Sequence, residues 1–374
     1  NPREYNGYKV YWEDGAQIGP EQAEAISAQM QQTDILEDVP DTGLAKLELI
    51  VPVPASVDAA YINGVLDERV NESAIPNVAE TFHVIYTPLH GAGITMVPEV
   101  LHRAGLTHLH VVPQQEKPNG DFPTVEHPNP EAKEAFVLGK ALAQTYDSDL
   151  IIATDPDCDR VGAMARNRDG EFVCITGNQM GALLLDYIIT AYQKKNTMPP
   201  SPYVVKSIVS TNLAAEICRR NQVQMYEVLT GFKYIGEIVK EKLKNGTGTF
   251  LLGFEESYGY LKGTYTRDKD AVVASLLICE MAAYYKTLGQ TLSDALENLF
   301  EKYGFYQERT LDFYFDMPGG QKKITAMMEN LRNCPPTALA KDPVITWRDY
   351  KIGKIFDNVT GNDRSTELPL SDIL

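Results

Sequence analysis

The stretch TDPDCDRVG, residues 154–162, places aspartates at three alternate positions, Asp155, Asp157 and Asp159. Two carboxylates about 4 Å apart repel by roughly 4 kcal/mol at an effective dielectric of 20, so such a cluster needs a cation or full exposure to water. In an extended loop, alternate side chains point to one side and can converge on one point. Mg²⁺ prefers oxygen ligands and keeps positions for water or a phosphoryl oxygen. The stretch therefore predicts a magnesium site.

Other interpretations of the stretch are weaker. A calcium-binding EF-hand loop is excluded, because it requires glycine and glutamate where this chain has Arg160 and Arg166. A solvated acidic turn remains the alternative. Cys158 is interpreted as a spacer, because soft thiolate and hard carboxylates favour different metals. Arg160 offers a planar pair of donors for a phosphate, with solvation at the surface as its alternative role.

Alternating elements lead up to the aspartates. The apolar runs TFHVIYTPL, HLHVVP and DLIIA are typical of strands, and the patterns MVPEVLHRAG and PEAKEAFVLGKALAQTY between them are typical of helices. Asn129 is a candidate cap of the second helix, with Pro130 at its first position. Strands that alternate with helices indicate a layered α/β domain, which binds ligands beyond the carboxyl ends of its strands. The aspartates follow such an end.

A second unit of the same kind follows along the chain. The run ITGNQMGALLLDYIITAYQ predicts a helix, YVVKSIVS predicts a strand, and TFLLGFEES predicts another strand that ends in polar residues. Two long helices come next, the last one closed by Gly304, and a smaller α+β piece follows. Near the start of the chain, KVYW (9–12) predicts a strand and residues 20–32 predict a polar helix.

Composition restricts the partners. The formal net charge of −17 argues against general binding to nucleic acid or to an anionic membrane, since both require a surplus of Lys and Arg. No apolar stretch approaches the roughly 20 residues that span a bilayer. The five cysteines are widely spaced and form no CxxC pair, which favours reduced thiols and a cytoplasmic protein. The sequence gives no indication of oligomeric state.

Five loops together resemble one family. They are TDPDCDRVG, YTPLHGAG (86–93), TGFKYIG (230–236), GFEESYGY (253–260) and RDKDA (267–271). This set is similar to the α-D-phosphohexomutase superfamily, and its last two members are most similar to the phosphoglucomutase/phosphomannomutase branch that also includes phosphopentomutases. The loops follow the family's order and span most of the chain. Five loops in register are specific, although each one alone would be a weak match.

The resemblance implies a multidomain α/β fold with layered α/β/α domains and a partial α+β domain at the C-terminal end. Residues 1–57 would be the end of domain one, 58–172 domain two, 173–304 domain three and 305–374 part of domain four. The implied enzyme interconverts hexose 1-phosphate and 6-phosphate, of glucose or mannose, through a phosphoserine and a hexose 1,6-bisphosphate. The alternatives are a phosphopentomutase or sugar-bisphosphate synthase of the same branch, and a non-catalytic paralogue that binds sugar phosphates.

The resemblance also implies roles for single residues. The three aspartates would hold Mg²⁺ against the phosphoserine. Glu255 and Ser257 would bind the sugar hydroxyls, while Glu256 between them points elsewhere if the loop is extended. Gly231 lies in the loop that reads sugar orientation and would allow close backbone approach. Lys233 would add positive charge there.

Further basic residues complete the implied site. Lys9 and Lys269 match active-site lysines, and either would act as general acid or base if neighbouring cations lower its pKa. Arg267 would add positive charge, and Arg160 would assist catalysis by binding phosphate. His90 in TPLHG is interpreted as a hydrogen-bonded loop residue rather than a catalyst.

Parts of the family pattern are not found. The family's reactive serine lies in a TASHNP-type segment directly before YNG, and this chain opens at NPREYNG, so Asn1 and Pro2 match only the tail of that segment. The RPSGTEP-type phosphate-binding loop of domain four does not appear before Leu374. We therefore expect a fragment that lacks the phosphoryl carrier and is inactive as a mutase on its own.

Overall fold

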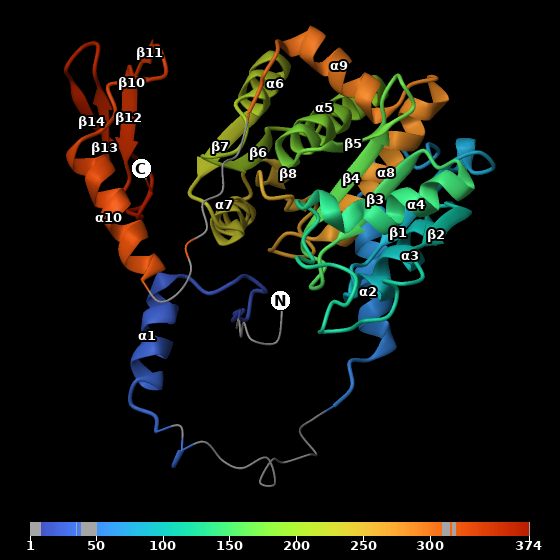
Figure 1. Ribbon diagram of the computed structural model, residues 1–374, viewed down its shortest axis with the longest axis horizontal. Coiled ribbons are helices and arrows are strands. Elements are labelled where there is room, and N and C mark those ends of the chain that lie inside the picture. Colours follow the sequence, from blue (N-terminus) through green and yellow to red (C-terminus); the bar gives the residue numbers. More distant parts are fainter. Residues whose placement is uncertain (1–8, 35, 39–50, 309–314, 316–318, 374) are drawn as a thin grey trace. The chain divides into compact units, whose positions relative to one another are not determined.

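The computed structural model describes residues 9–34, 36–38, 51–308, 315 and 319–373 (Figure 1). The chain forms two compact units, Asn1–Tyr306 and Gln307–Leu374. Asn1 and Pro2, which match the tail of the serine segment, lie outside the described residues. The layered, multidomain α/β architecture expected from the sequence is confirmed in the first unit, which contains two α/β sheets.

The first sheet carries the aspartates at one end. Its order is β2-β1-β3-β4-β5: β1, β2 and β3 run parallel, β4 pairs antiparallel to β3, and β5 pairs antiparallel to β4. The strands are β1 (His83–Thr87), β2 (His108–Val111), β3 (Leu150–Thr154), β4 (Val161–Arg166) and β5 (Phe172–Ile175). All five residues of β3 are buried, as in strands that are covered on both faces. The helices of this layer are α2 (Ala55–Asp67), α3 (Gly93–Arg103) and α4 (Val137–Tyr146).

The second sheet repeats this topology. Its order is β7-β6-β8-β9, with three parallel strands followed by an antiparallel one. The strands are β6 (Pro202–Ser207), β7 (Gln224–Val228), β8 (Thr249–Phe254) and β9 (Tyr260–Leu261), and the helices are α5 (Gly177–Lys195), α6 (Leu213–Asn221) and α7 (Phe232–Asn245). In both sheets the first parallel strand lies between the second and the third. The same connection rule thus places polar loops at the carboxyl ends of both.

The helix α8 (Ala271–Thr287) joins the two sheets into one core. It follows β9 in the chain, yet it packs against α2 and α3 of the first sheet as well as against α5 (Figure 1). Residues of both sheets belong to one continuous cluster of buried apolar side chains. The next helix, α9 (Leu292–Tyr303), begins with a capping box between Thr291 and Asp294. It ends at Gly304, and this end was predicted from the sequence.

The remaining elements are small. The first unit also contains α1 (Pro20–Met30) and the short turns η3 (Pro76–Val78) and η4 (Lys133–Phe136). The unit Gln307–Leu374 contains α10 (Gly320–Asn333), the strand pair β10 (Ala338–Leu339) and β11 (Asp342–Pro343), and a sheet of β12 (Thr346–Asp349), β13 (Lys354–Asp357) and β14 (Asp363–Ser365). In that unit Arg332 donates to the buried Asp349 at 3.2 Å, which ties α10 to the sheet.

Two local predictions are wrong. KVYW (9–12) forms no strand, and Tyr11 makes only an isolated bridge with Gln17. The helix expected from Asn129 begins later, because Ala132 is extended and the turn η4 comes before α4. The side chain of Asn129 instead accepts a hydrogen bond from the Glu131 amide at 3.0 Å, a local alternative that competes with helix formation.

No described helix is by itself long and apolar enough to cross a membrane. Only α8 and α9 taken together reach the required length and composition, and they are bent by 85° at the break between them.

One buried carboxylate fastens α8 to both layers. Glu280 is 1% exposed, and its Oε1 accepts hydrogen bonds from the Val70 and Asn71 amides and from the Tyr187 hydroxyl. Its Oε2 has no hydrogen-bond partner among the described residues. The oxygen Oε1 therefore carries the structural role.

We predict that Glu280→Ala lowers the free energy of unfolding by at least about 3 kcal/mol, because it leaves three buried donors without an acceptor. Glu280→Gln keeps one carbonyl-type oxygen and is expected to cost clearly less. Denaturant unfolding followed by circular dichroism measures both. Equal stability of the alanine variant and the parent chain would refute this role.

Candidate functional site

The aspartates lie in the hairpin loop between β3 and β4, whose last pair is Thr154 and Val161. The Asp155 side chain organises this loop: its Oδ1 accepts from the amides of Asp159 and Arg160, both at 3.0 Å. Cys158, between Asp155 and Asp159, adopts a positive φ of 60° and turns the chain there. The loop therefore holds its shape through a carboxylate that is itself a candidate ligand.

The three carboxylates converge. One oxygen from each of Asp155, Asp157 and Asp159 lies within 4.8 Å of the other two. Asp155 is 8% exposed, Asp159 is partly buried and Asp157 is exposed. Burial, together with the charges of Asp159 and Asp157, raises the pKa of Asp155 to about 8. A nearby cation favours the ionised form of a buried carboxyl that lies among other acids. The three carboxylates offer only oxygen donors, and such a donor set fits a hard divalent ion.

Two lysines meet at the same carboxylate. Lys9 Nζ lies 2.8 Å from Asp159 Oδ2 and 3.6 Å from Asp157 Oδ2, and Lys269 Nζ lies 3.0 Å from Asp159 Oδ2. Partial burial of Asp159 acts to raise its pKa, but Lys269 and Lys9 outweigh it and lower the pKa below the usual range. The structure thus brings both lysines to the loop 155–160, which is the candidate metal loop and is called the metal loop below.

The condition attached to Lys9 as a general acid or base is not met. The sequence interpretation required neighbouring cations that lower its pKa. Burial does act in that direction, but the hydrogen bond to Asp159 and the charges of Asp159, Asp157 and Asp268 outweigh it. The pKa of Lys9 is therefore raised above its usual range, and its amine stays protonated at neutral pH.

The loop that follows β8 is joined to the metal loop by its backbone. Arg160 and Gly259 form an antiparallel bridge, and the Val161 amide donates to the Tyr258 carbonyl at 3.1 Å. Arg160 also pairs through its side chain with Glu131 Oε1, at 3.0 Å. The loops 155–160 and 255–259 therefore form adjoining walls of one site.

Glu255 and Glu256 point to different partners. Glu255 is 4% exposed, and its Oε1 accepts from the Gly231 amide at 2.8 Å. Burial raises the pKa of Glu255, although the Gly231 amide and Lys269 act to lower it. Glu256 Oε2 instead accepts from the hydroxyls of Ser207 and Ser210, at 3.0 and 3.3 Å. Only Glu255 faces the loop that contains Gly231.

The other residues expected from the sequence lie around this loop. Gly231 is the cap of α7 and has a φ of 122°, which favours glycine. Lys233 lies on the first turn of α7 with its Nζ 5.0 Å from the centre of the Tyr234 ring. The Arg267 carbonyl lies 2.7 Å from the position of a Cβ at Gly236, so its segment crosses the same helix closely. Ser257 is partly exposed.

Sequence reasoning missed Asp270. It is 7% exposed and caps α8 through the amides of Val272 and Val273, while the hydroxyls of Tyr61 and Tyr265 donate to the same carboxylate. Burial raises its pKa. Its position directly before a long apolar helix was the available sequence sign of a cap.

A groove of about 530 Å³ adjoins the metal loop. It is lined by Lys9, Tyr11, Gly15, Tyr61, Asp157, Cys158, Asp159, Thr266, Asp268, Lys269 and Asp270. The Tyr11 hydroxyl donates to Asp268 at 2.7 Å, which adds a second link between the segment around Lys9 and the RDKDA loop. The groove thus combines two of the three candidate metal ligands, Asp157 and Asp159, with both lysines.

The loop TPLHGAG packs against the metal loop at Pro156. Both ring nitrogens of His90 have hydrogen-bond partners, the Lys117 carbonyl at 3.2 Å and the Thr124 hydroxyl at 2.9 Å, as expected for a loop residue rather than a catalyst. The Ala92 amide donates to the Pro156 carbonyl at 2.8 Å. A Cβ at Gly91 would lie 2.3 Å from Pro156 Cα, so only glycine allows this approach.

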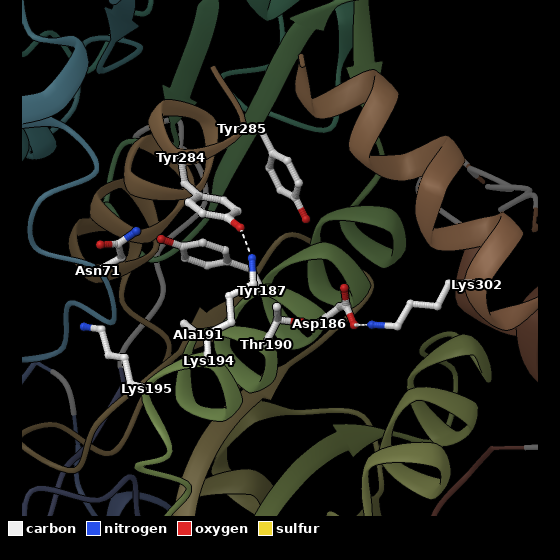
Figure 2. Close-up of a pocket in the computed structure, with 10 residues that line it drawn as sticks. All are labelled: Asn71, Asp186, Tyr187, Thr190, Ala191, Lys194, Lys195, Tyr284, Tyr285 and Lys302. Carbon is white, nitrogen blue, oxygen red and sulfur yellow. Dashed lines mark hydrogen bonds and ion pairs between the residues drawn. The ribbon is translucent and has the colours of Figure 1, made fainter. Parts of the chain in front are cut away.

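A separate pocket of about 260 Å³ lies between α5, α8 and α9 (Figure 2). Lys302 donates to Asp186 there at 2.8 Å, and Lys194 bonds the Tyr284 hydroxyl. None of its lining residues belongs to the metal loop or to the loop after β8.

Sequence models of one family match most of the chain. Residues 59–170 match the α/β/α domain II of phosphoglucomutase/phosphomannomutase, residues 176–303 match its domain III, and residues 1–36 match its domain I. The phosphoglucomutases of Staphylococcus saprophyticus and Staphylococcus epidermidis are 33% and 34% identical across 100% of this chain. The chain spans 67% of the length of each of these relatives.

Solved structures show the same fold. A Thermus thermophilus protein named as a phosphomannomutase matches 78% of this chain and 58% of its own, with 22% identity and a TM-score of 0.58. The parafusin phosphoglucomutase of Paramecium, in its open form, matches 83% of this chain and 51% of its own, with 15% identity and a TM-score of 0.52.

We predict that Asp157→Asn weakens Mg²⁺ binding at least about tenfold, because it removes one of three charged ligands. The Asp157 side chain is 62% exposed, so the melting temperature should not change. Isothermal titration with Mg²⁺ measures the affinity. Asp169→Asn, at an exposed turn of the same domain, is the control. Unchanged affinity would mean that the carboxylates do not act together.

We also predict that Gly91→Ala weakens Mg²⁺ binding about 10- to 100-fold, the usual effect of disturbing the support of a ligand loop. The added methyl group displaces Pro156 and with it the aspartates on either side. Gly120→Ala is the matched control, because a Cβ at Gly120 meets no atom within 4 Å. Equal Mg²⁺ affinities of the two variants would contradict the supporting role of Gly91.

Proposed function

The chain belongs to the phosphoglucomutase/phosphomannomutase family, a family of isomerases that transfer phosphoryl groups. On this basis we propose that the protein to which it belongs is a phosphohexomutase. The proposed reaction moves phosphate between the 1- and 6-positions of a hexose through a phosphoserine and a hexose 1,6-bisphosphate. The observation that carries the proposal is the backbone bridge between Arg160 and Gly259, which sets the metal loop beside the loop of Glu255.

In this proposal Asp155, Asp157 and Asp159 hold Mg²⁺. Their all-oxygen donor set supports this choice over a softer metal. The ion supplies charge neutralisation for a phosphoryl group in transfer. Asp155 is held by hydrogen bonds from the amides of Asp159 and Arg160, so the chain itself preorganises the loop.

Glu255 and Ser257 bind the sugar hydroxyls in this proposal. Glu255 uses Oε1 for the Gly231 amide and, as a carboxylate, keeps further acceptor capacity. Its burial strengthens a hydrogen bond to a ligand, because little water competes there. Gly231, Lys233 and Arg267 surround the ligand from the side of α7.

The basic residues hold phosphate in this proposal. Lys9 is protonated at neutral pH and its pKa is raised, so it acts as an ammonium that pairs with phosphate rather than as a general acid or base. Lys269, which pairs with the same oxygen of Asp159 as Lys9, and Arg160, which lies nearest the other oxygen, add cationic donors. These charges provide the local basic site that an anionic ligand needs on so acidic a protein.

We predict that a protein carrying this chain together with the family's serine segment interconverts glucose 1-phosphate and glucose 6-phosphate when supplied with Mg²⁺ and glucose 1,6-bisphosphate. The names of the relatives support glucose as the sugar. Parallel assays with mannose and ribose 1-phosphates measure the preference. Turnover of the pentose alone would favour a phosphopentomutase. Ligand binding without any turnover would favour the non-catalytic paralogue.

In the same protein we predict that Glu255→Gln lowers kcat/KM for the hexose phosphate at least about tenfold, because a charged acceptor for a sugar hydroxyl is lost. Glu241→Gln, at an exposed position of α7, is the control. Full activity of the Glu255 variant would remove Glu255 from the binding site while leaving the metal assignment intact.

A further inference from the structure

Three histidines gather at the end of the first sheet opposite to the aspartates. His83 is the first residue of β1, and His108 and His110 lie on β2. In the parallel register His83 pairs with His108, and Ile85 pairs with His110. Alternate residues of paired strands share a face, so all three imidazoles lie on one side of the sheet. The metal loop follows the other end of the same layer, after β3.

Their ring nitrogens converge. One nitrogen from each histidine lies within 4.8 Å of the other two. His110 Nε2 and His83 Nδ1 are 3.4 Å apart. Two nitrogens bound to one tetrahedral zinc ion at about 2.0–2.1 Å lie about 3.3 Å from each other. One pair is thus at ligand spacing. The His108 ring stacks on His83 at 4.3 Å, so binding by all three histidines requires the His108 side chain to rotate toward the same point.

The surroundings leave the three imidazoles accessible to a metal ion. All three histidines are partly exposed. The Tyr146 ring stacks on His110 at 3.7 Å and limits how far that ring can turn. Stacking on Tyr146 explains the position of His110, but it does not require the nitrogens of three histidines to converge.

We propose that His83, His108 and His110 form a second metal site, which binds a borderline divalent ion of the zinc type. Imidazole suits Zn²⁺, whereas three carboxylates suit Mg²⁺, so the two sites take different ions. Three protein ligands leave a fourth position to water. The bound ion links β2, at the edge of the sheet, to β1, which leads directly into the loop that supports the aspartates.

Titration calorimetry with Zn²⁺ in saturating Mg²⁺ tests the site in the full chain. The background carries Cys334→Ser, so that this free, exposed thiol does not contribute a separate zinc ligand. We expect one equivalent of Zn²⁺ and a higher melting temperature with zinc than without it. The double variant His108→Gln/His110→Gln should lose both effects. His127→Ala, which removes an exposed loop histidine, should keep them.

Further variants separate this site from the metal loop. Asp157→Asn should lose Mg²⁺ affinity and keep its equivalent of Zn²⁺. His108→Gln alone should weaken Zn²⁺ binding at least about tenfold with an unchanged circular dichroism spectrum, which guards against a double variant that fails to fold. Zinc binding that survives in both histidine variants overturns the proposal. Loss of zinc binding in Asp157→Asn also overturns it, because the ion would then occupy the aspartates.

Discussion

The backbone pairing of two loops is the constraint on which the site depends. Arg160 bridges to Gly259, just before β9, and the Ala271 amide, which follows β9 in the chain, donates to the Cys158 carbonyl at 3.2 Å. The metal loop is therefore hydrogen-bonded to residues on both sides of β9. Backbone bonds of this kind do not depend on side-chain identity. They set the aspartates and Glu255 side by side before any ligand binds. The core helix α8, which starts at Ala271, then fixes both loops to one hydrophobic core.

Charge balance explains why this groove needs a cation to accept a phosphate. Its lining carries four carboxylates, from Asp157, Asp159, Asp268 and Asp270, against the ammonium groups of Lys9 and Lys269. Asp155 adds a fifth acid beside them, and it responds by resisting ionisation. An incoming phosphate would meet net negative charge. A divalent ion at the aspartates offsets that negative charge, which leaves the ammonium groups of Lys9 and Lys269 available to an anionic ligand.

Local motifs allowed much of the site to be predicted, and distant contacts account for what was missed. The aspartate loop and GFEES could be placed because each directly follows a strand of apolar residues. The network of Asp270 with Tyr61, the role of Glu280 and the histidine cluster depend on residues far apart in sequence or on strand register, which no single segment encodes. The delayed start of α4 shows that a cap and a proline can instead form a turn.

The pairing of the two loops also limits how the site can close on a ligand. Segments that share backbone bonds cannot part without losing several of them, so 155–160 and 255–259 act as one wall. The described segment 9–17 differs, because side-chain bonds tie it to that wall and its surroundings: Lys9 to Asp159 in the wall, Tyr11 to Asp268, and Asp14 to Lys240 on α7. A phosphate competes for Lys9 directly. In the proposed enzyme, adjustment to a ligand therefore belongs to the segment of Lys9, and the fixed wall would orient the sugar.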